Sequence, residues 1–173
     1  MTLSPHNSDD VSRAGAGDRA AFARLHARYR RLVMGVLLAR LDPGDAEELA
    51  QEVFVSAWLR PPELKDPAAF PAWLCTIARN RALDLLRSRR FSLFRTSPRE
   101  PTVGPVPASE AREALAAIRA LPEAYRETLV LRLVYDLSGP EIAALTGLTE
   151  GSVRVNLHRG MAALRASLGG QDG

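Results

Sequence analysis

The sequence is short of the residues on which disulfides, metal sites and many active sites depend. Cys75 is the single cysteine among 173 residues, so one chain can form neither an internal disulfide nor a cysteine-based zinc site. The three histidines are scattered and form no catalytic triad or metal cluster, and no glycine-rich phosphate loop is present. We therefore expect no catalytic residue, no metal and no cofactor, and a buried structural role for Cys75.

Lysine and long apolar runs are also scarce. Lys65 is the single lysine among 23 basic residues, and the formal net charge is +3. The longest apolar run, Leu32–Ala39, is far shorter than the ~20 residues that a membrane-spanning helix needs. The polar, acidic N-terminus has no apolar core of a signal peptide. These absences predict a cytoplasmic protein with no membrane-inserted segment.

What the sequence does contain is helical periodicity, most clearly in Ser138–Leu164. Ser138 and Glu141 have the spacing of a capping box, and Gly147 can take the positive φ that ends a short helix. Thr149 can then cap a second helix, whose apolar positions recur at helical spacing: Val153, Leu157, Met161, Leu164 and Leu168. Two helices around a glycine-containing turn are typical of a helix-turn-helix. The outward face of the second helix offers side chains that can contact bases and phosphates: Ser152, Arg154, Asn156, His158 and Arg159.

Three further helices are predicted earlier in the chain. Asp18 can cap a helix that runs to about Arg40, and Asp45 can cap a second one after the turn at 42–44. The second helix carries acidic residues and a glutamine beside its apolar positions: Asp45, Glu47, Glu48, Gln51 and Glu52. The third, from about Phe70 to Arg90, gathers arginines with an aromatic and an amide residue, which favours nucleic-acid binding over a merely solvated face: Trp73, Arg79, Asn80, Arg81, Arg87, Arg89 and Arg90.

A proline-rich stretch divides the chain, and no strand pattern occurs on either side of it. Residues 92–108 include four prolines and have no helical period, which indicates an extended linker. The sequence thus predicts an all-α protein with two small helical domains, 18–91 and 109–168, joined by the flexible linker 92–108. Flexible tails are expected at 1–17 and 169–173.

Three segments, in this order, resemble a bacterial RNA polymerase sigma factor of the extracytoplasmic-function (ECF) type of the sigma-70 family. They are Asp45–Arg60, Phe70–Arg90 and Leu121–Leu168. The resemblance implies that 18–91 is sigma region 2, which binds core polymerase and the −10 element, and that 109–168 is region 4, which binds the −35 element. It implies a factor that directs promoter-specific transcription initiation and aids DNA opening. Its implied partners are RNA polymerase core enzyme, promoter DNA and an anti-sigma factor.

The resemblance also assigns roles to individual residues. It implies docking on the polymerase clamp helices by Asp45, Glu47, Glu48, Gln51 and Glu52. It implies contacts with the −10 element by the loop 61–69 and by Trp73, Arg79, Asn80, Arg81 and Arg87. It implies contacts with the −35 element by Ser152, Arg154, Val155, Asn156, His158 and Arg159. Val155 departs from the polar or basic residue that is common there and offers only an apolar contact, for example to a thymine methyl group.

Two other functions stay open on the sequence alone. A helix-turn-helix regulator that acts without core polymerase would account for Ser138–Leu164, but not for the acidic helix or the arginine-rich helix. An enzyme in a helical fold would lack any recognisable site. The linker favours the sigma interpretation, because its seventeen residues at ~3.3 Å each reach roughly 56 Å. That length suits two domains that contact promoter elements about two helical turns apart.

Overall fold

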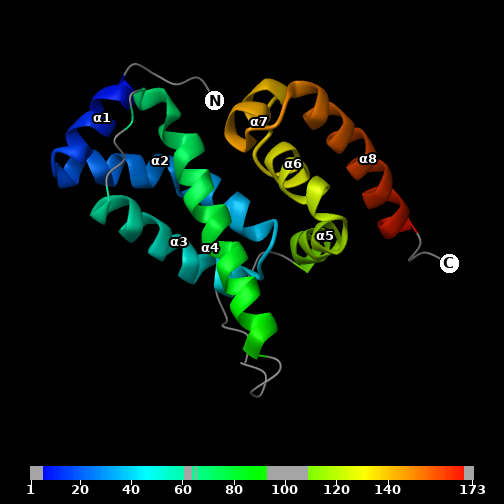
Figure 1. Cartoon of the computed structure of the whole chain (residues 1–173). Helices are drawn as coiled ribbons and strands as arrows, with labels where there is room; N and C mark the ends of the chain where they lie inside the picture. Colours follow the sequence, from blue (N-terminus) through cyan, green and yellow to red (C-terminus); the bar gives the residue numbers. More distant parts are fainter. Residues whose placement is uncertain (1–5, 61–63, 65, 93–108, 170–173) are drawn as a thin grey trace.

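The computed structural model describes residues 6–60, 64, 66–92 and 109–169, and all regular structure within them is helical. The elements are α1 (His6–Gly15), α2 (Arg19–Leu38), α3 (Pro43–Leu59), the 3₁₀ turn η1 (Pro67–Ala69), α4 (Phe70–Ser92), α5 (Ser109–Ala120), α6 (Glu123–Leu133), α7 (Gly139–Thr146) and α8 (Glu150–Gly169). Elements α1 to α4 form an N-terminal domain and α5 to α8 a C-terminal domain, which lie side by side (Figure 1). The predicted all-α fold is confirmed; the linker at 93–108 lies outside the described residues.

The predicted helix signals act as expected at three of the helix starts. The Asp18 carboxylate accepts hydrogen bonds from the backbone N–H groups of residues 20 and 21, at 2.9 and 3.1 Å. Ser138 and Glu141 form a complete capping box at the start of α7, and Gly147 ends that helix with φ at 74°. The Thr149 hydroxyl accepts from the N–H of Ser152 at 3.1 Å and caps α8. These bonds satisfy backbone groups that a helix end leaves unpaired.

One local prediction is wrong, and one apolar position of α8 is exposed. The second predicted helix begins at Pro43 with Asp42 as its N-cap residue, so Asp45 lies in the first turn instead of capping it. Proline suits that first position because its φ is already helical and its missing N–H has no partner to lose. Leu168, counted among the apolar positions of α8, is 42% exposed. It lies in the last turn of α8.

The N-terminal tail is the largest difference from the sequence prediction. Residues 1–17 were expected to be flexible, but His6–Gly15 form α1, which packs on α2 and η1. Val11 is buried, and the buried Asp10 carboxylate accepts two hydrogen bonds from Arg24, at 3.0 and 2.6 Å. The tertiary contact with α2 therefore stabilises a short helix that its own sequence would support only weakly.

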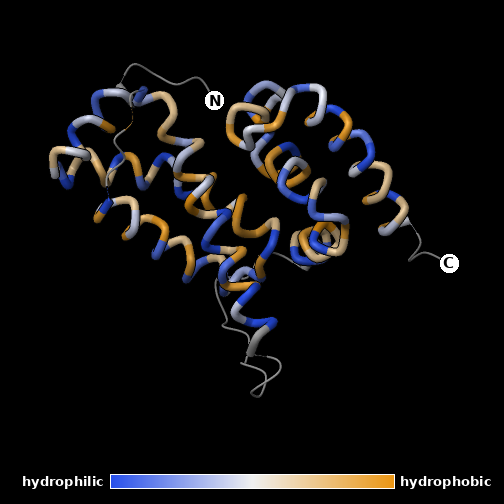
Figure 2. The backbone as a smooth tube through the Cα atoms, in the orientation of Figure 1, coloured by the Kyte–Doolittle hydropathy of each residue, from blue (hydrophilic) through white to orange (hydrophobic). Residues whose placement is uncertain are grey.

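Hydrophobic and hydrophilic residues alternate along the helices of both domains (Figure 2), and many of the apolar side chains are buried. The N-terminal core is centred on large, fully buried side chains of α2, α3 and α4: Leu25, Tyr29, Val33, Val36, Val53 and Leu74. The C-terminal core contains Leu115, Ile118, Leu121, Leu129, Val130 and Leu164. Ala39, at the end of α2, lies in this second cluster.

The two domains are in direct contact through a surface that we call the seam. It is formed by α2 and α4 on one side and α6 and α7 on the other. Leu131, Leu137 and Ile142 of the C-terminal domain belong to the same buried cluster as the N-terminal core. At Gly35 a side-chain Cβ would stand 2.3 Å from Cε2 of Tyr135, so only glycine admits the tyrosine ring there. The seam is therefore built with shape complementarity.

Candidate nucleic-acid and polymerase interfaces

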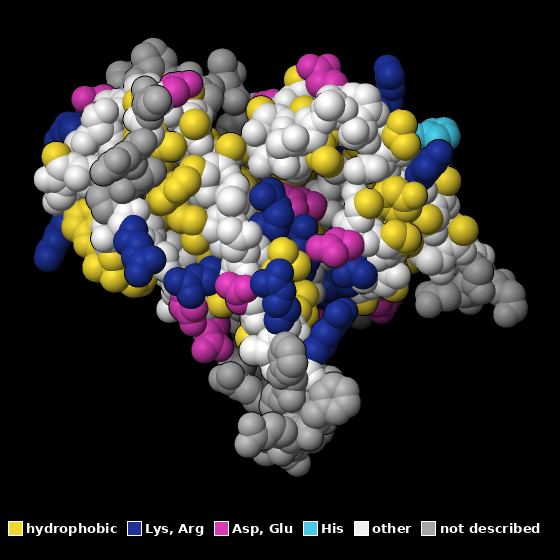
Figure 3. Space-filling view, viewed as in Figure 1, with side chains coloured by type: hydrophobic (Ala, Val, Ile, Leu, Met, Phe, Trp, Pro, Cys, Tyr) yellow, Lys and Arg dark blue, Asp and Glu magenta, His cyan; other side chains and the backbone are white. Residues whose placement is uncertain are grey.

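The second helix of the helix-turn-helix, α8, presents the predicted −35 residues on its outer side. Ser152, Arg154, Val155, His158 and Arg159 are exposed, Val155 to 44%, and Asn156 is half-buried. Figure 3 shows basic side chains and a histidine along this outer edge of the molecule. The arrangement leaves donors and one apolar side chain free to enter a DNA groove. Ser152 is the exception, because its hydroxyl is bonded to Thr149 at 2.9 Å as part of the helix cap.

The inner side of α8 explains a glycine in the middle of this helix. Gly160 is buried, and a Cβ there would stand 3.0 Å from Leu129 and 3.0 Å from Tyr125 of α6. Its absence lets α8 approach α6 closely. Glycine destabilises the helix by up to ~1 kcal/mol, and the close packing of α8 on α6 offsets this cost.

The arginine-rich helix, α4, divides its predicted −10 residues between two surroundings. Asn80, Arg81 and Arg87 are exposed. Arg81 donates to Ser56 Oγ at 3.0 Å, and Arg87 pairs with Asp84 at 3.0 Å. The half-buried ring of Trp73 packs against Phe70, with ring centroids 5.6 Å apart. Of the preceding loop, residues 61–63 and 65 lie outside the described residues, whereas η1 is capped by Asp66 at 2.9 Å.

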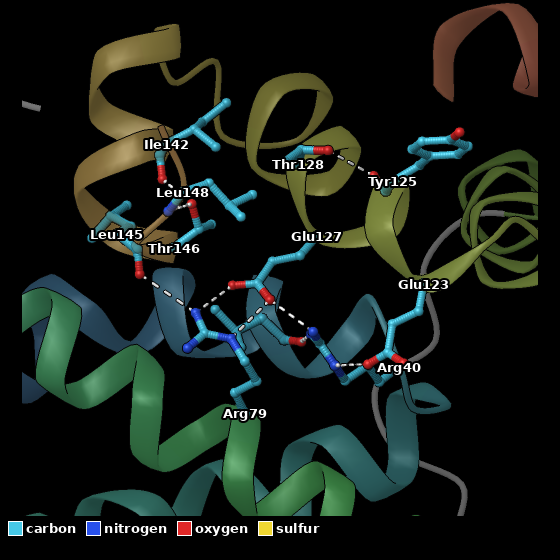
Figure 4. A network of polar contacts seen from close by, with 11 residues as sticks. Arg40, Arg79, Glu123, Tyr125, Glu127, Thr128, Ile142, Leu145, Thr146 and Leu148 are labelled. Carbon is cyan, nitrogen blue, oxygen red and sulfur yellow. Dashed lines mark hydrogen bonds and ion pairs between the residues drawn. The ribbon is translucent and has the colours of Figure 1, made fainter. Parts of the chain in front are cut away.

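Arg79, the remaining predicted −10 residue, points away from that open face and into the seam. Its guanidinium makes a two-pronged contact with Glu127 of α6, Nε to Oε2 at 3.1 Å and Nη2 to Oε1 at 2.8 Å. Arg40 Nη2 lies 2.9 Å from Oε2 of the same carboxylate (Figure 4). The hydrogen bond to Glu127 raises the pKa of Arg79 above its usual range. Glu127 is 6% exposed, so its charge is balanced almost entirely by the N-terminal domain.

Further contacts extend this polar strip along the seam. Arg79 Nη2 also approaches the carbonyl oxygen of Leu145 at 3.4 Å, and Arg119 of α5 pairs with Asp42 at 3.0 Å. Figure 3 shows the strip as neighbouring blue and magenta side chains between the two halves of the molecule. Arg40 and Glu127 were not among the sequence-predicted site residues. Nothing local marks them, since each looks like an ordinary charge on a helix and their partners lie far away in the chain.

The acidic helix, α3, has fewer available carboxylates than its sequence indicates. Asp45 accepts two hydrogen bonds from Arg89, at 2.6 and 2.8 Å, and Glu47 pairs with Arg30. Both acids therefore serve to hold α3 against α4 and α2. Glu48, Gln51 and Glu52 are exposed.

Two apolar residues continue the exposed face of α3. Val55 is 56% exposed and Leu59 70% exposed. Their spacing from Glu48 and Glu52 places them on the same side of the helix. The sequence carried this signal, because Val55 and Leu59 are out of phase with the buried residues Val53 and Ala57.

The described residues offer few other groups that could bind a metal ion or react. Within them, no group of histidine, cysteine and acidic side chains is placed to hold a metal ion. The helices described include none that is long and apolar enough to cross a membrane. Cys75 is fully buried, and burial, with a smaller effect of Glu127, raises the pKa of its thiol to about 12. Such a thiol stays protonated and unreactive at neutral pH.

Comparison with known proteins shows which family carries these surfaces. A family profile described as Sigma-70 region 2 matches residues 25–92, and one described as Sigma-70, region 4 matches residues 111–164. The chain is 35% identical over 175 residues to the ECF RNA polymerase sigma factor ShbA of Streptomyces griseus, covering 90% of this chain and 92% of ShbA. The chain belongs to the ECF type of the sigma-70 family. The N-terminal domain is thus region 2 and the C-terminal domain region 4, as the resemblance implied.

Further relatives support the same family. The RNA polymerase sigma factor CarQ of Myxococcus xanthus is 37% identical over 165 residues, which cover 91% of this chain and 93% of CarQ. The chain spans only 45% of a longer relative, RfaY of Xanthomonas campestris, at 33% identity over 180 residues. Sigma factors give RNA polymerase its promoter specificity and are not themselves enzymes, which excludes the helical enzyme and disfavours a regulator independent of polymerase.

Solved structures agree with the fold of both regions together. CnrH, in complex with the cytosolic domain of CnrY, superimposes with a TM-score of 0.69 at 29% identity, covering 95% of this chain and 98% of CnrH. RpoE of Bartonella quintana, in complex with the anti-sigma factor NepR, gives a TM-score of 0.68 at 22% identity over 85% of this chain and 96% of RpoE.

Proposed function

We propose that this ECF sigma factor docks on core polymerase through the exposed face of α3 and contacts promoter DNA through α8 and α4. The observation that carries the proposal is the exposed outer side of α8, where a capped helix-turn-helix holds arginine and histidine side chains clear of the core. A helix so placed enters the major groove, with its N-terminal half at the base edges.

For the −35 element, Arg154, Asn156, His158 and Arg159 act as donors to bases or phosphates, and Val155 packs on a thymine methyl group. Ser152 lies in the first turn of α8, bonded to the capping Thr149, and contributes through its position near the helix N-terminus, where a phosphate is favoured. For the −10 element, Asn80, Arg81 and Arg87 follow the opened strand from the exposed face of α4. Trp73 contributes by holding the start of α4 through its contact with Phe70.

The polymerase-docking face is Glu48, Gln51 and Glu52, extended by Val55 and Leu59. Carboxylates steer the encounter with a basic partner, while exposed apolar side chains supply surface to bury at the contact centre. Asp45 and Glu47 act indirectly, since their ion pairs with Arg89 and Arg30 fix the orientation of α3.

We further propose that an anti-sigma factor controls this chain in the cytoplasm, as CnrY accompanies CnrH in one solved complex and the anti-sigma factor NepR accompanies RpoE in another. An apolar cleft of about 160 Å³ opens at the seam between the start of α4 and α7 and fits an apolar side chain of such a partner. It is lined by Ala68, Pro71, Ala72, Leu137, Glu141, Ala144 and Leu145.

Run-off transcription from a library of promoter sequences, with purified core polymerase and the full chain, tests the proposal. We expect transcription that depends on the chain and selects two sequence elements. Glu52→Arg should weaken competition for core about tenfold or more. Asp9→Arg, the same charge reversal at an exposed acid of α1, should leave competition unchanged. Absence of core binding by the unaltered chain would refute the proposed function, and equal effects of the two reversals would refute the docking face.

A further inference from the structure

We propose that Arg40 and Arg79 form a phosphate site for promoter DNA, and that Glu127 fills this site in the free protein and so keeps region 2 from DNA. The inference rests on the proposed function, in which α4 faces the −10 element. It adds Arg40 to the DNA-binding residues and assigns Glu127 the role of an internal competitor.

The first support is the chemistry of the contact. Glu127 receives the fork of Arg79 at 2.8 and 3.1 Å and a third contact from Arg40 at 2.9 Å. A carboxylate and a phosphate both accept such two-pronged contacts from arginine. The Arg40 Nε is buried and makes no hydrogen bond within the described residues, with Glu123 Oε1 3.5 Å away. The site therefore has donor capacity that the Glu127 carboxylate leaves unused and that Glu123 meets only at ion-pair distance, and a phosphate, with more oxygens, can take it.

The second support is where the partners come from. The polar contacts described for the Glu127 carboxylate are made by the N-terminal domain, although α6 belongs to region 4 (Figure 4). A buried charge whose partners lie in another domain stabilises the contact between domains and adds nothing to the helix that carries it. On the other side, Arg79 has a side chain 21% exposed, whereas its α4 neighbours Asn80 and Arg81 are exposed.

The third support is that the closed arrangement is specific. Gly35 leaves room for the ring of Tyr135, and Arg119 pairs with Asp42 beyond the end of α2. The apolar residues Leu131 and Ile142 are fully buried in the shared cluster. A contact with complementary shape, paired charges and buried apolar surface defines one closed state. An open state must lose all of these interactions to uncover Arg40 and Arg79.

The test compares two isosteric changes that remove the same charge. Glu127→Gln takes the buried carboxylate that pairs with both arginines out of the site. Glu123→Gln removes an acid that is 59% exposed, pairs with Arg40 at 3.5 Å and leaves Glu127 in place. The readout is the fluorescence anisotropy of a fluorescein-labelled DNA duplex with an unpaired central stretch, bound by the full chain without polymerase at fixed salt. If the open state of the unaltered chain is a minor one, Glu127→Gln should tighten binding by about 10- to 1,000-fold. Glu123→Gln should tighten it by no more than about threefold, the effect of net charge on phosphate binding.

A second variant keeps the test usable if Glu127→Gln does not fold. Arg119→Gln breaks another ion pair of the seam and leaves Arg40 and Arg79 in place. It removes a positive charge, so tighter DNA binding would run against the charge change and could come only from opening. Adding Arg79→Gln to Glu127→Gln should abolish the gain. Equal tightening by Glu127→Gln and Glu123→Gln, or a gain that survives Arg79→Gln, would overturn the proposal. The proposed function is judged separately, by run-off transcription with the unaltered chain.

Discussion

Replacing Gly35 by alanine should reveal whether the two regions pack in solution as the structure has them. Gly35 lies within α2, where alanine taken alone would stabilise the helix by up to ~1 kcal/mol. At the seam, however, the new Cβ would stand 2.3 Å from Cε2 and 2.9 Å from Cζ of Tyr135. Those atoms belong to a stiff ring that is packed against both hydrophobic clusters, with the Arg31 guanidinium 5.8 Å above it. The two effects therefore have opposite signs.

The expected change in stability is the cost of the clash with Tyr135 minus the gain in helix propensity. Inserting a methyl group into a packed site costs typically about 1–3 kcal/mol, and helix propensity returns at most ~1 kcal/mol of this. We expect the free energy of unfolding of the full chain to fall by about 1–2 kcal/mol, measured by urea denaturation followed by circular dichroism. Gly151→Ala in α8 is the matched control, because its Cβ would meet only Thr149 Oγ1, at 3.9 Å.

A double-mutant cycle isolates the cause. With Tyr135→Ala as background the clash is absent, so Gly35→Ala should be neutral or stabilising there. If Gly35→Ala stabilises the unaltered chain by the same amount as in that background, Tyr135 does not pack on α2 and the seam is not as described.

Two further predictions address buried groups. Burial raises the pKa of Cys75 from 9.0 to about 12, so an aromatic disulfide reagent at a pH near 9.0 should leave the thiol of the full chain unlabelled. Glu127→Gln should speed labelling because it opens the seam. Equal labelling rates in the two proteins would show that the seam does not shield the thiol. The hydrogen bond from Arg24 lowers the pKa of Asp10 below 3.8, so the stabilisation of α1 is present above that value and is lost as the pH falls through the lowered pKa. The protection of the α1 amides against hydrogen exchange, measured relative to the intrinsic exchange rate at each pH, should therefore fall in acid, and Asp10→Asn should show low protection at every pH. An α1 that stays protected in that variant would contradict the role of the ion pair.

The parts of the molecule that sequence predicted correctly are those set by local rules. The capping box of Ser138 and Glu141, the left-handed Gly147 and the Thr149 cap depend on residues within one helical turn of each other. The exposure of Arg154 and Arg159 follows from the phase of α8 alone, because the buried residues Val153 and Leu164 fix which side faces the core. Helical phase is a property that a one-dimensional pattern contains.

The sequence could not predict which of several chemically similar residues makes a given tertiary contact. Arg79, Arg81 and Arg87 have the same chemistry in one helix, yet only the tertiary contact with Glu127 turns Arg79 away from the open face. Asp45 and Glu48 are likewise equivalent in the pattern, and the sequence does not show that Asp45 forms a two-pronged contact with Arg89 of α4. The docking of α1 was missed for the same reason, since the Asp10–Arg24 pair joins two elements that carry no shared local signal.

The ion pairs and the apolar contacts of the seam respond differently to DNA, and this difference couples opening to the presence of DNA phosphates. When the domains part in water, Arg40 and Arg79 lose a buried carboxylate, and the apolar side chains of Leu131 and Ile142 lose their cover. When they part onto DNA, a phosphate replaces the carboxylate of Glu127, so the guanidinium groups keep charge-assisted hydrogen bonds. The loss of buried apolar surface and of the Arg119–Asp42 ion pair still opposes opening. Because the Glu127 carboxylate resembles a phosphate, it disfavours the open state most when no DNA phosphate is available to replace it.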